Sequence, residues 1–205
     1  MLRLILLRHG QTIGQKGCYY GWSDIELSAL GEKQSEQVVD AVGSAAIDAV
    51  FSSDLSRAKY LGNLLACKRG LPLLVDERLR EVNFGAWEEQ PSSELFKNER
   101  FQKWLTNVAD EPIPDGESMS LLMKRSTEFL NHLSAEYQDK TVAVTAHYGS
   151  LKCLYLAAFG MILTDFWTFH IELASITILN YDMLNPRILL LNDLCHLGGL
   201  NAHFD

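Results

Sequence analysis

Short apolar runs alternate along this sequence with longer segments whose apolar residues have helical spacing. Residues 4–7 form a continuous apolar run, which is typical of a strand buried on both faces. The long segment at 118–137 instead repeats its apolar residues at three- and four-residue intervals, which predicts a helix. Strand–helix alternation predicts an α/β three-layer sandwich: a mostly parallel central sheet with helices on both faces.

The pattern assigns most of the chain to regular elements. We expect strands at 4–7, 49–51, 73–75, 141–145, 175–181 and 187–191, and helices at 28–42, 56–68, 92–108, 118–137 and 149–159. The last two strands form a pair with a turn at Asn185-Pro186. No linker or repeat divides the sequence, so residues 1–205 are expected to form one domain. Residues 88–114, which prolines interrupt, are expected to form a cap segment.

Composition excludes several classes of partner. A formal net charge of −8 argues against nucleic acid and against an anionic membrane, but not against a small phosphorylated metabolite in a positive pocket. The four cysteines lack C-x-x-C spacing, so we expect buried thiols in a reducing compartment and no zinc site. The N-terminal apolar run is too short for a signal peptide, and no stretch approaches membrane-spanning length. We therefore expect a cytoplasmic protein.

Five polar residues follow expected strands. Arg8 and His9 lie just past the carboxyl end of the first strand, and His147 lies just past that of the fourth. Arg57 lies in the first turn of the helix after the second strand, and Glu81 lies in the loop after the third. Ligands of such sheets bind beyond the carboxyl ends of the strands, so these side chains are expected to meet at one edge. Each also has an ordinary alternative. Arg8-His9 could lie in an exposed loop, and His147 could be a core histidine bonded to backbone. Arg57 could be a solvated helix residue or half of an ion pair, and Glu81 could belong to a surface salt-bridge cluster.

Together these residue types suit phosphoryl chemistry. Two guanidinium groups can offer paired donors to a phosphate dianion, and the amino end of the Arg57 helix adds backbone donors. Between cations, the neutral imidazole of His9 is a nucleophile toward phosphorus. The imidazole of His147 can donate to the oxygens that gain charge in the transition state. Since these groups supply positive charge, we expect neither a metal nor a cofactor.

Five motifs occur in a fixed order. They are Leu7-Arg8-His9-Gly10-Gln11-Thr12, Gly21-Trp22-Ser23-Asp24 with Leu27-Ser28 and Gly31, Phe51-Ser52-Ser53-Asp54-Leu55-Ser56-Arg57-Ala58, Leu79-Arg80-Glu81-Val82-Asn83-Phe84-Gly85-Ala86-Trp87-Glu88, and Pro114-Asp115-Gly116-Glu117-Ser118. With them, nearly the whole chain resembles the histidine phosphatase superfamily, in its phosphoglycerate-mutase-like branch. The resemblance implies that His9 is the phosphorylated nucleophile and that Arg8, Arg57 and His147 bind the phosphoryl group. It also implies that Glu81 protonates the leaving oxygen and then activates water.

The chain departs from the family at two positions in the expected site. Gln15 stands where many members have an asparagine that donates to phosphate, and we expect it to bind phosphate. Tyr148 stands where the family usually has glycine, so it either narrows the pocket and contacts substrate or packs outward. Gln11, Tyr20 and Gly21 are further candidates for substrate binding.

The resemblance also suggests a subfamily. Residues 191–197 and 20–24 look like those of the α-ribazole-5'-phosphate phosphatases of cobalamin biosynthesis. The alternatives are a broad-specificity sugar-phosphate or phosphoglycerate phosphatase, a phosphoglycerate mutase, and a non-catalytic phosphate-ester-binding module. The segment between the Glu81 and Pro114 motifs is short, which favours hydrolysis over mutase activity. The presence of His9, Glu81 and His147 argues against the binding module.

Substrate selection is expected from residues 88–114 and from the loop 11–20. Phe96, Phe101 and Trp104 either cap the site for a flat ring or pack as ordinary helix aromatics. The other histidines are expected to bind no metal: His132 exposed, His170 structural, His196 closing the fold and His203 near the C-terminus. The oligomeric state stays open, with a homodimer as one alternative.

Overall fold

A central sheet organises the computed structural model, which describes residues 1–42 and 45–200; His203 lies outside this part. Its strands are β1 (Leu2–Arg8), β2 (Ala49–Ser52), β3 (Leu73–Val75), β4 (Thr141–Ala146), β5 (Ile176–Tyr181) and β6 (Arg187–Asp193), in the order β3-β2-β4-β1-β5-β6. The first four are parallel to one another, whereas β5 pairs with β1, and β6 with β5, in antiparallel fashion. The expected mostly parallel sheet is confirmed.

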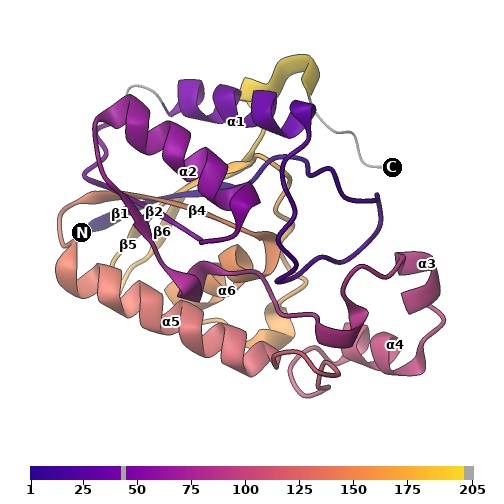
Figure 1. Cartoon of the computed structure of the whole chain (residues 1–205). Coiled ribbons are helices and arrows are strands. Elements are labelled where there is room, and N and C mark those ends of the chain that lie inside the picture. The colour runs from indigo at the N-terminus through magenta and orange to yellow at the C-terminus, as the bar shows by residue number, and fades with distance from the viewer. Residues whose placement is uncertain (43–44, 201–205) are drawn as a thin grey trace.

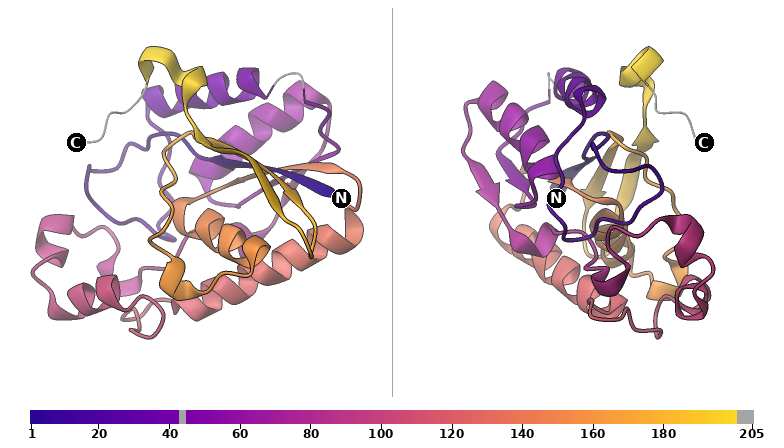
Figure 2. Two further views of the ribbon diagram at one scale, coloured as in Figure 1. Left: turned by 180° about the vertical axis from the view of Figure 1, so that it is seen from behind. Right: turned by 45° about the vertical axis from the view of Figure 1, so that its right-hand side comes forward.

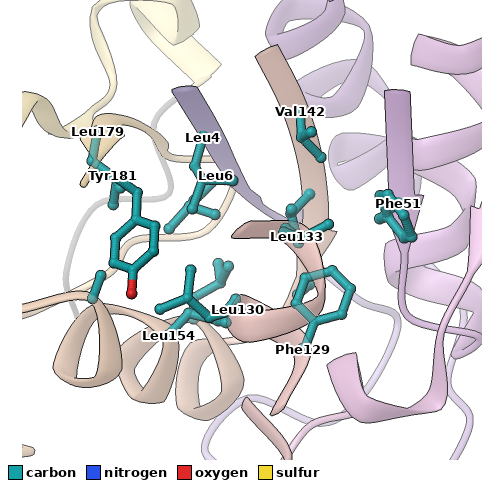
Figure 3. Packing of buried hydrophobic residues seen from close by; sticks show 14 of the residues in the cluster. Leu4, Leu6, Phe51, Phe129, Leu130, Leu133, Val142, Leu154, Leu179 and Tyr181 are labelled. Atoms are coloured by element: carbon teal, nitrogen blue, oxygen red, sulfur yellow. The ribbon is translucent and has the colours of Figure 1, made fainter. Parts of the chain in front are cut away.

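Helices cover both faces of the sheet, as the two orientations of Figure 2 show. The helices α1 (Ala29–Ala41) and α2 (Ser56–Arg69) lie on one face, and α5 (Met119–Glu136) and α6 (Tyr148–Phe159) on the other. Side chains of β1 alternate between the two layers, because successive residues of a strand point to opposite faces. Leu4 and Leu6 join the cluster under α5 and α6 (Figure 3), while Ile5 and Leu7 join the cluster under α1 and α2. This explains why the run 4–7 is continuously apolar.

Helix ends follow local chemistry. The Ser28 hydroxyl accepts from the Gly31 N–H and caps α1, and the Ser118 hydroxyl accepts from the Leu121 N–H and caps α5. Each cap residue lies just outside its helix, so these helices begin one residue later than predicted. Gly160 ends α6 in the left-handed conformation, which glycine adopts without steric cost.

The segment expected to form one helix over 92–108 forms two. The helix α3 (Ser92–Leu95) is followed by α4 (Glu99–Thr106), and the break falls at Asn98. Its side-chain oxygen accepts from the backbone N–H groups of Arg100 and Phe101 and so starts a new helix. Both helices lie beside the main sandwich rather than on the sheet (Figure 1). The description of 88–114 as a cap stays a prediction.

The expectation that the cysteines are buried is only partly right. Cys153 is buried in α6, but Cys67 and Cys195 are exposed, since they lie on the solvent side of their helices. None of the four forms a disulfide.

Candidate active site

The register of two central strands brings His9 and His147 together. The last residue of β1, Arg8, is paired with the last residue of β4, Ala146, so the next residue of each strand leaves the sheet at the same level. The two imidazole rings have centroids 5.1 Å apart. The prediction that both histidines meet at the carboxyl edge of the sheet is therefore confirmed.

Arg57 links the second histidine to a neighbouring loop. This side chain is buried in the first turn of α2, where its Nε donates to Nδ1 of His147 over 3.2 Å. Its Nη1 and Nη2 donate to the carbonyl oxygens of Ser23 at 3.0 Å and Gly21 at 2.6 Å. Arg57 thus fixes the ring of His147 and the loop that passes over the site.

The hydrogen bonds assign the tautomers of the two imidazoles. Nδ1 of His9 lies 2.7 Å from the carbonyl oxygen of Gly10, which can only accept, so Nδ1 carries the proton and Nε2 keeps a lone pair. Nδ1 of His147 accepts from Arg57, so its proton is on Nε2. In the part of the chain that the structure describes, Nε2 of His147 and Nε of Arg8 are buried without a hydrogen-bond partner.

Electrostatics keep both rings neutral. Burial, assisted by the cationic Arg57 and Arg8, holds the pKa of His9 well below its usual value of 6.5. Burial and the same two arginines also hold the pKa of His147 well below that value. A neutral imidazole with a free lone pair therefore lies beside unsatisfied N–H donors, which is an arrangement suited to an anionic electrophile.

Glu81 lies at the amino end of α6. Both of its carboxylate oxygens accept from the Gly149 N–H, at 2.9 and 3.1 Å, and one also accepts from the Val82 N–H at 2.9 Å. The alternative of a surface salt-bridge cluster does not describe it, because Arg80 pairs with Asp54 instead. These N–H donors hold the Glu81 side chain in place where it lines the cavity.

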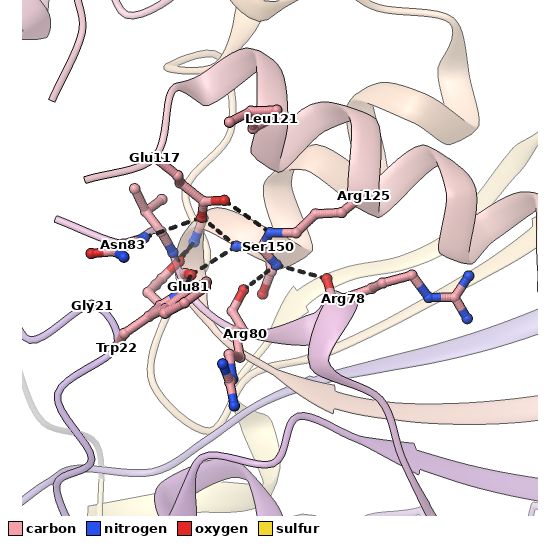
Figure 4. A network of polar contacts seen from close by, with 12 residues as sticks. Gly21, Trp22, Arg78, Arg80, Glu81, Asn83, Glu117, Leu121, Arg125 and Ser150 are labelled. Atoms are coloured by element: carbon pink, nitrogen blue, oxygen red, sulfur yellow. Dashed lines mark hydrogen bonds and ion pairs between the residues drawn. The ribbon is translucent and has the colours of Figure 1, made fainter. Parts of the chain in front are cut away.

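A buried network holds the loop that carries Glu81 (Figure 4). Arg125 of α5 pairs with Glu117 and donates to the carbonyl oxygens of Arg78, Arg80 and Glu81 at 2.7, 2.6 and 2.8 Å. Glu117 lies in one of the five motifs, but no pattern in the sequence indicates Arg125, because no spacing rule connects position 125 to residues 78–81.

A cavity of about 660 Å³ opens over these groups. It is lined by every residue predicted for the site except His147: Arg8, His9, Gln11, Gln15, Tyr20, Gly21, Arg57, Glu81 and Tyr148. His147 is buried beneath the cavity beside His9. Gln15 is exposed, and the backbone N–H of Gln15 donates to the Tyr20 hydroxyl. The phosphate-binding role of Gln15 stays a prediction.

Residues 88–114 pack against the loop 11–21, which lines the cavity. None of them lines it, but Trp104 lines a smaller pocket that shares Glu81 and Tyr148 with it, so a contact of this segment with substrate stays a prediction. The Ser92 N–H donates to the Gly17 carbonyl at 2.7 Å, and the buried ring of Phe101 packs edge-on against Tyr19. Phe101 and Trp104 are buried in the apolar core of this small two-helix unit, whereas Phe96 is exposed. The loop 11–21 provides the lining instead.

Tyr148 faces the cavity rather than the outside. The guanidinium of Arg8 lies over its ring, 5.1 Å from the centroid. Nζ of Lys152 donates to the Tyr148 hydroxyl over 3.0 Å, although Lys152 is only 1% exposed. Burial lowers the pKa of Lys152 to about 8. Lys152 was not among the predicted site residues, and its one signal in the sequence is a lysine within an otherwise apolar helix.

The remaining histidines of the described part, His132, His170 and His196, lie in separate places. His132 is partly buried against Phe51 rather than exposed, because α5 packs that side of its surface onto the sheet layer. His170 pairs with Glu172, and His196 contacts the Ala174 carbonyl and so ties the C-terminal segment to the site. Within residues 1–42 and 45–200, no three His, Cys, Asp or Glu side chains gather closely enough to hold a metal ion. In the same residues, no helix has both the length and the apolar character that crossing a membrane requires.

Comparison with known proteins agrees with this geometry. The family described as histidine phosphatase superfamily (branch 1) matches residues 4–194. Phosphoserine phosphatase 1 of Hydrogenobacter thermophilus is 28% identical over 97% of this chain and 95% of its own. The adenosylcobalamin/alpha-ribazole phosphatase of Escherichia coli is 28% identical over 83% and 86%. The crystal structure of a phosphoserine phosphatase from Entamoeba histolytica with 3-phosphoglyceric acid superposes with a TM-score of 0.86, at 27% identity over 96% and 100%. The chain therefore belongs to the histidine phosphatase superfamily (branch 1) and is a phosphatase.

Proposed function

We propose that this chain hydrolyses phosphomonoesters of small metabolites through a phosphohistidine formed on His9. One observation carries the proposal: the lone pair on Nε2 of His9 lies next to two buried donors without partners, on Arg8 and His147. Buried polar groups are normally hydrogen-bonded, so orphaned donors at the base of a cavity indicate that an anion completes the site. Phosphate oxygens would accept from both donors.

In the first step, Nε2 of His9 attacks phosphorus, and the N–P bond forms as the ester P–O bond breaks. Glu81, protonated at that stage, gives its proton to the leaving oxygen, so the alcohol departs neutral. In the second step, the Glu81 carboxylate takes a proton from water, the water oxygen attacks phosphorus and the N–P bond breaks. Inorganic phosphate leaves, and His9 and protonated Glu81 are restored.

The surrounding donors lower the barrier of both steps. Arg8, Arg57 and His147 stabilise the charge that spreads over the equatorial oxygens, without reorganising during the reaction. Both guanidinium groups stay cationic because arginine remains protonated in proteins. The chemistry derived from these residues requires neither a metal nor a cofactor.

The substrate proposed from the sequence is α-ribazole-5'-phosphate, in cobalamin biosynthesis. The likeness to the Escherichia coli phosphatase named for that substrate supports it. Of the aromatics expected to suit a flat ring, none lines the cavity of about 660 Å³, and Trp104 lines the smaller pocket that shares Glu81 and Tyr148 with it. Phosphoserine and 3-phosphoglycerate are the competing esters, and a phosphoglycerate mutase is the competing activity. The cytoplasmic location and the homodimer stay predictions.

A substrate panel tests the proposal. We expect turnover of p-nitrophenyl phosphate, with kcat/KM compared across α-ribazole-5'-phosphate, phosphoserine and 3-phosphoglycerate. Quenching the wild type during turnover should trap an acid-labile phosphoenzyme, which His9→Ala should not form. Turnover by His9→Ala at the wild-type rate would rule out the phosphohistidine route. Dependence on a bisphosphoglycerate primer would favour the mutase instead.

A further inference from the structure

Among the described residues that line the cavity, two carry carboxylates, Glu81 and Glu172, and the reaction proposed above uses only Glu81. Glu172 lies in the segment before β5, and its side chain is 15% exposed. Its Oε1 is buried and has no hydrogen-bond partner in the described part of the chain, although Nε2 of His170 lies 2.8 Å away. A largely desolvated carboxylate in a phosphate cavity requires an explanation, because it repels the dianion that the cavity binds.

The backbone around Glu172 is held firmly beside the nucleophile. The Glu172 N–H donates to Oδ1 of Asn192 over 2.7 Å, and the Ala174 N–H donates to the carbonyl oxygen of His9 over 3.0 Å. Ala174 and Asn192 have φ values of 55° and 50°, in the left-handed region. Such conformations are costly for alanine and persist only where the surrounding structure imposes them. The position of the Glu172 carboxylate relative to His9 is therefore determined by the fold.

Glu172 does not serve as the direct partner of Arg8. Nη1 of Arg8 donates to the Ile171 carbonyl, and no ion pair joins Arg8 to Glu172 among the described residues. His170, whose Nε2 lies 2.8 Å from Oε1 of Glu172, has 53% of its side chain exposed. The negative charge of Glu172 thus lies next to the phosphate site, within electrostatic range of Arg8 but without a direct ion pair to it in the described part of the chain.

We propose that Glu172 binds an ammonium group of the substrate, so that the cavity selects phosphomonoesters of amino alcohols or hydroxy amino acids. The inference rests on the proposed function. A primary ammonium offers three N–H donors to a carboxylate, and the charge-assisted bond offsets the desolvation of both groups. For an ester without a cation, the same carboxylate only opposes the phosphate, so one residue discriminates in both directions.

Two pairs of esters that differ only in an amino or a hydroxyl group test this proposal. The pairs are phosphoserine with 3-phosphoglycerate, and phosphoethanolamine with 2-hydroxyethyl phosphate. In the wild type we expect kcat/KM to favour the amino member of each pair by about tenfold or more, as a charge-assisted hydrogen bond provides. Glu172→Gln, which keeps the shape and removes the charge, should reduce that preference by about the same factor.

Glu26→Gln is the matched control. Glu26 is exposed and does not line the cavity, and its carbonyl oxygen accepts from Ile13 N–H in the loop 11–21, which lines the cavity. This variant should keep the wild-type preference. Absence of an amino preference in the wild type overturns the proposal without any variant, while turnover of p-nitrophenyl phosphate leaves the proposed function standing. Equal slowing of both members of a pair by Glu172→Gln also overturns it and assigns Glu172 to shaping the site. Failure to hydrolyse any of the five esters refutes the proposed function itself.

Discussion

Replacing Arg125 tests whether the network behind Glu81 supports both the fold and the reaction. The side chains of Arg125 and Glu117 are 14% and 11% exposed, so the pair is largely removed from water. Arg125→Met leaves the Glu117 carboxylate with the Asn83 N–H as its remaining partner in this network, and it leaves three backbone carbonyls without their guanidinium donor. Breaking one side of a buried pair costs about 3–5 kcal/mol.

We take the lower end, about 3 kcal/mol, because some water reaches both side chains. That is a large part of the 5–15 kcal/mol that typically stabilises a domain. Urea unfolding of the wild type, Arg125→Met, Glu117→Gln and the double variant measures the free energies of unfolding. The double variant should lose at least about 1 kcal/mol less than the sum of the single losses, because the two residues interact directly.

Steady-state kinetics of the same proteins measure the effect on catalysis. Arg125→Met should also lower kcat, since the Glu81 carbonyl loses a bond that holds its loop. Lys124→Met is the matched control, because Lys124 is adjacent in α5 and its side chain is 71% exposed. It should change stability by less than about 0.5 kcal/mol. A loss below about 1 kcal/mol in Arg125→Met, with unchanged kcat, would refute the reasoning.

Three further predictions concern individual residues. A Cβ at Gly149 would lie 2.5 Å from Oε1 of Glu81, so Gly149→Ala should lower kcat at least about tenfold with the circular dichroism spectrum preserved; full kcat would contradict this. The pKa of Lys152 is about 8 in the fold and 10.5 by reference, so the unfolded chain holds this proton more tightly. The stability of the wild type relative to Lys152→Met should therefore rise by up to about 3 kcal/mol from pH 8 to 10.5 in urea titrations, and a flat difference would refute it. The pKa values of His9 and His147 are lowered, so the free energy of unfolding should fall as pH drops below 6.5, by up to about 1.4 kcal/mol per pH unit for each ring. His9→Asn should reduce that slope, and an unchanged slope would count against a buried neutral His9.

The sequence alone determined the parts of this protein that depend on local pattern and on sheet topology. The apolar run of β1 and the helical spacing of α5 predict buried elements, because burial on two faces or one stripe demands those patterns. The parallel sheet then places residues that follow β1 and β4 at one edge, whatever their separation in the chain. For this reason the sequence alone predicts that His9 and His147 lie close together.

Only the tertiary structure decided the surroundings of these groups. Arg125 reaches residues 78–81, and Glu172 reaches the cavity beside Arg8. The rings of Phe166 and Trp167, which lie outside α6, also pack against Lys152. The tertiary structure also showed that residues 88–114 contact the loop 11–21, whose residues line the cavity. The physical reason is that charge, desolvation and hydrogen-bond supply depend on neighbours far apart in sequence, whereas strand and helix patterns record only whether each residue faces the core.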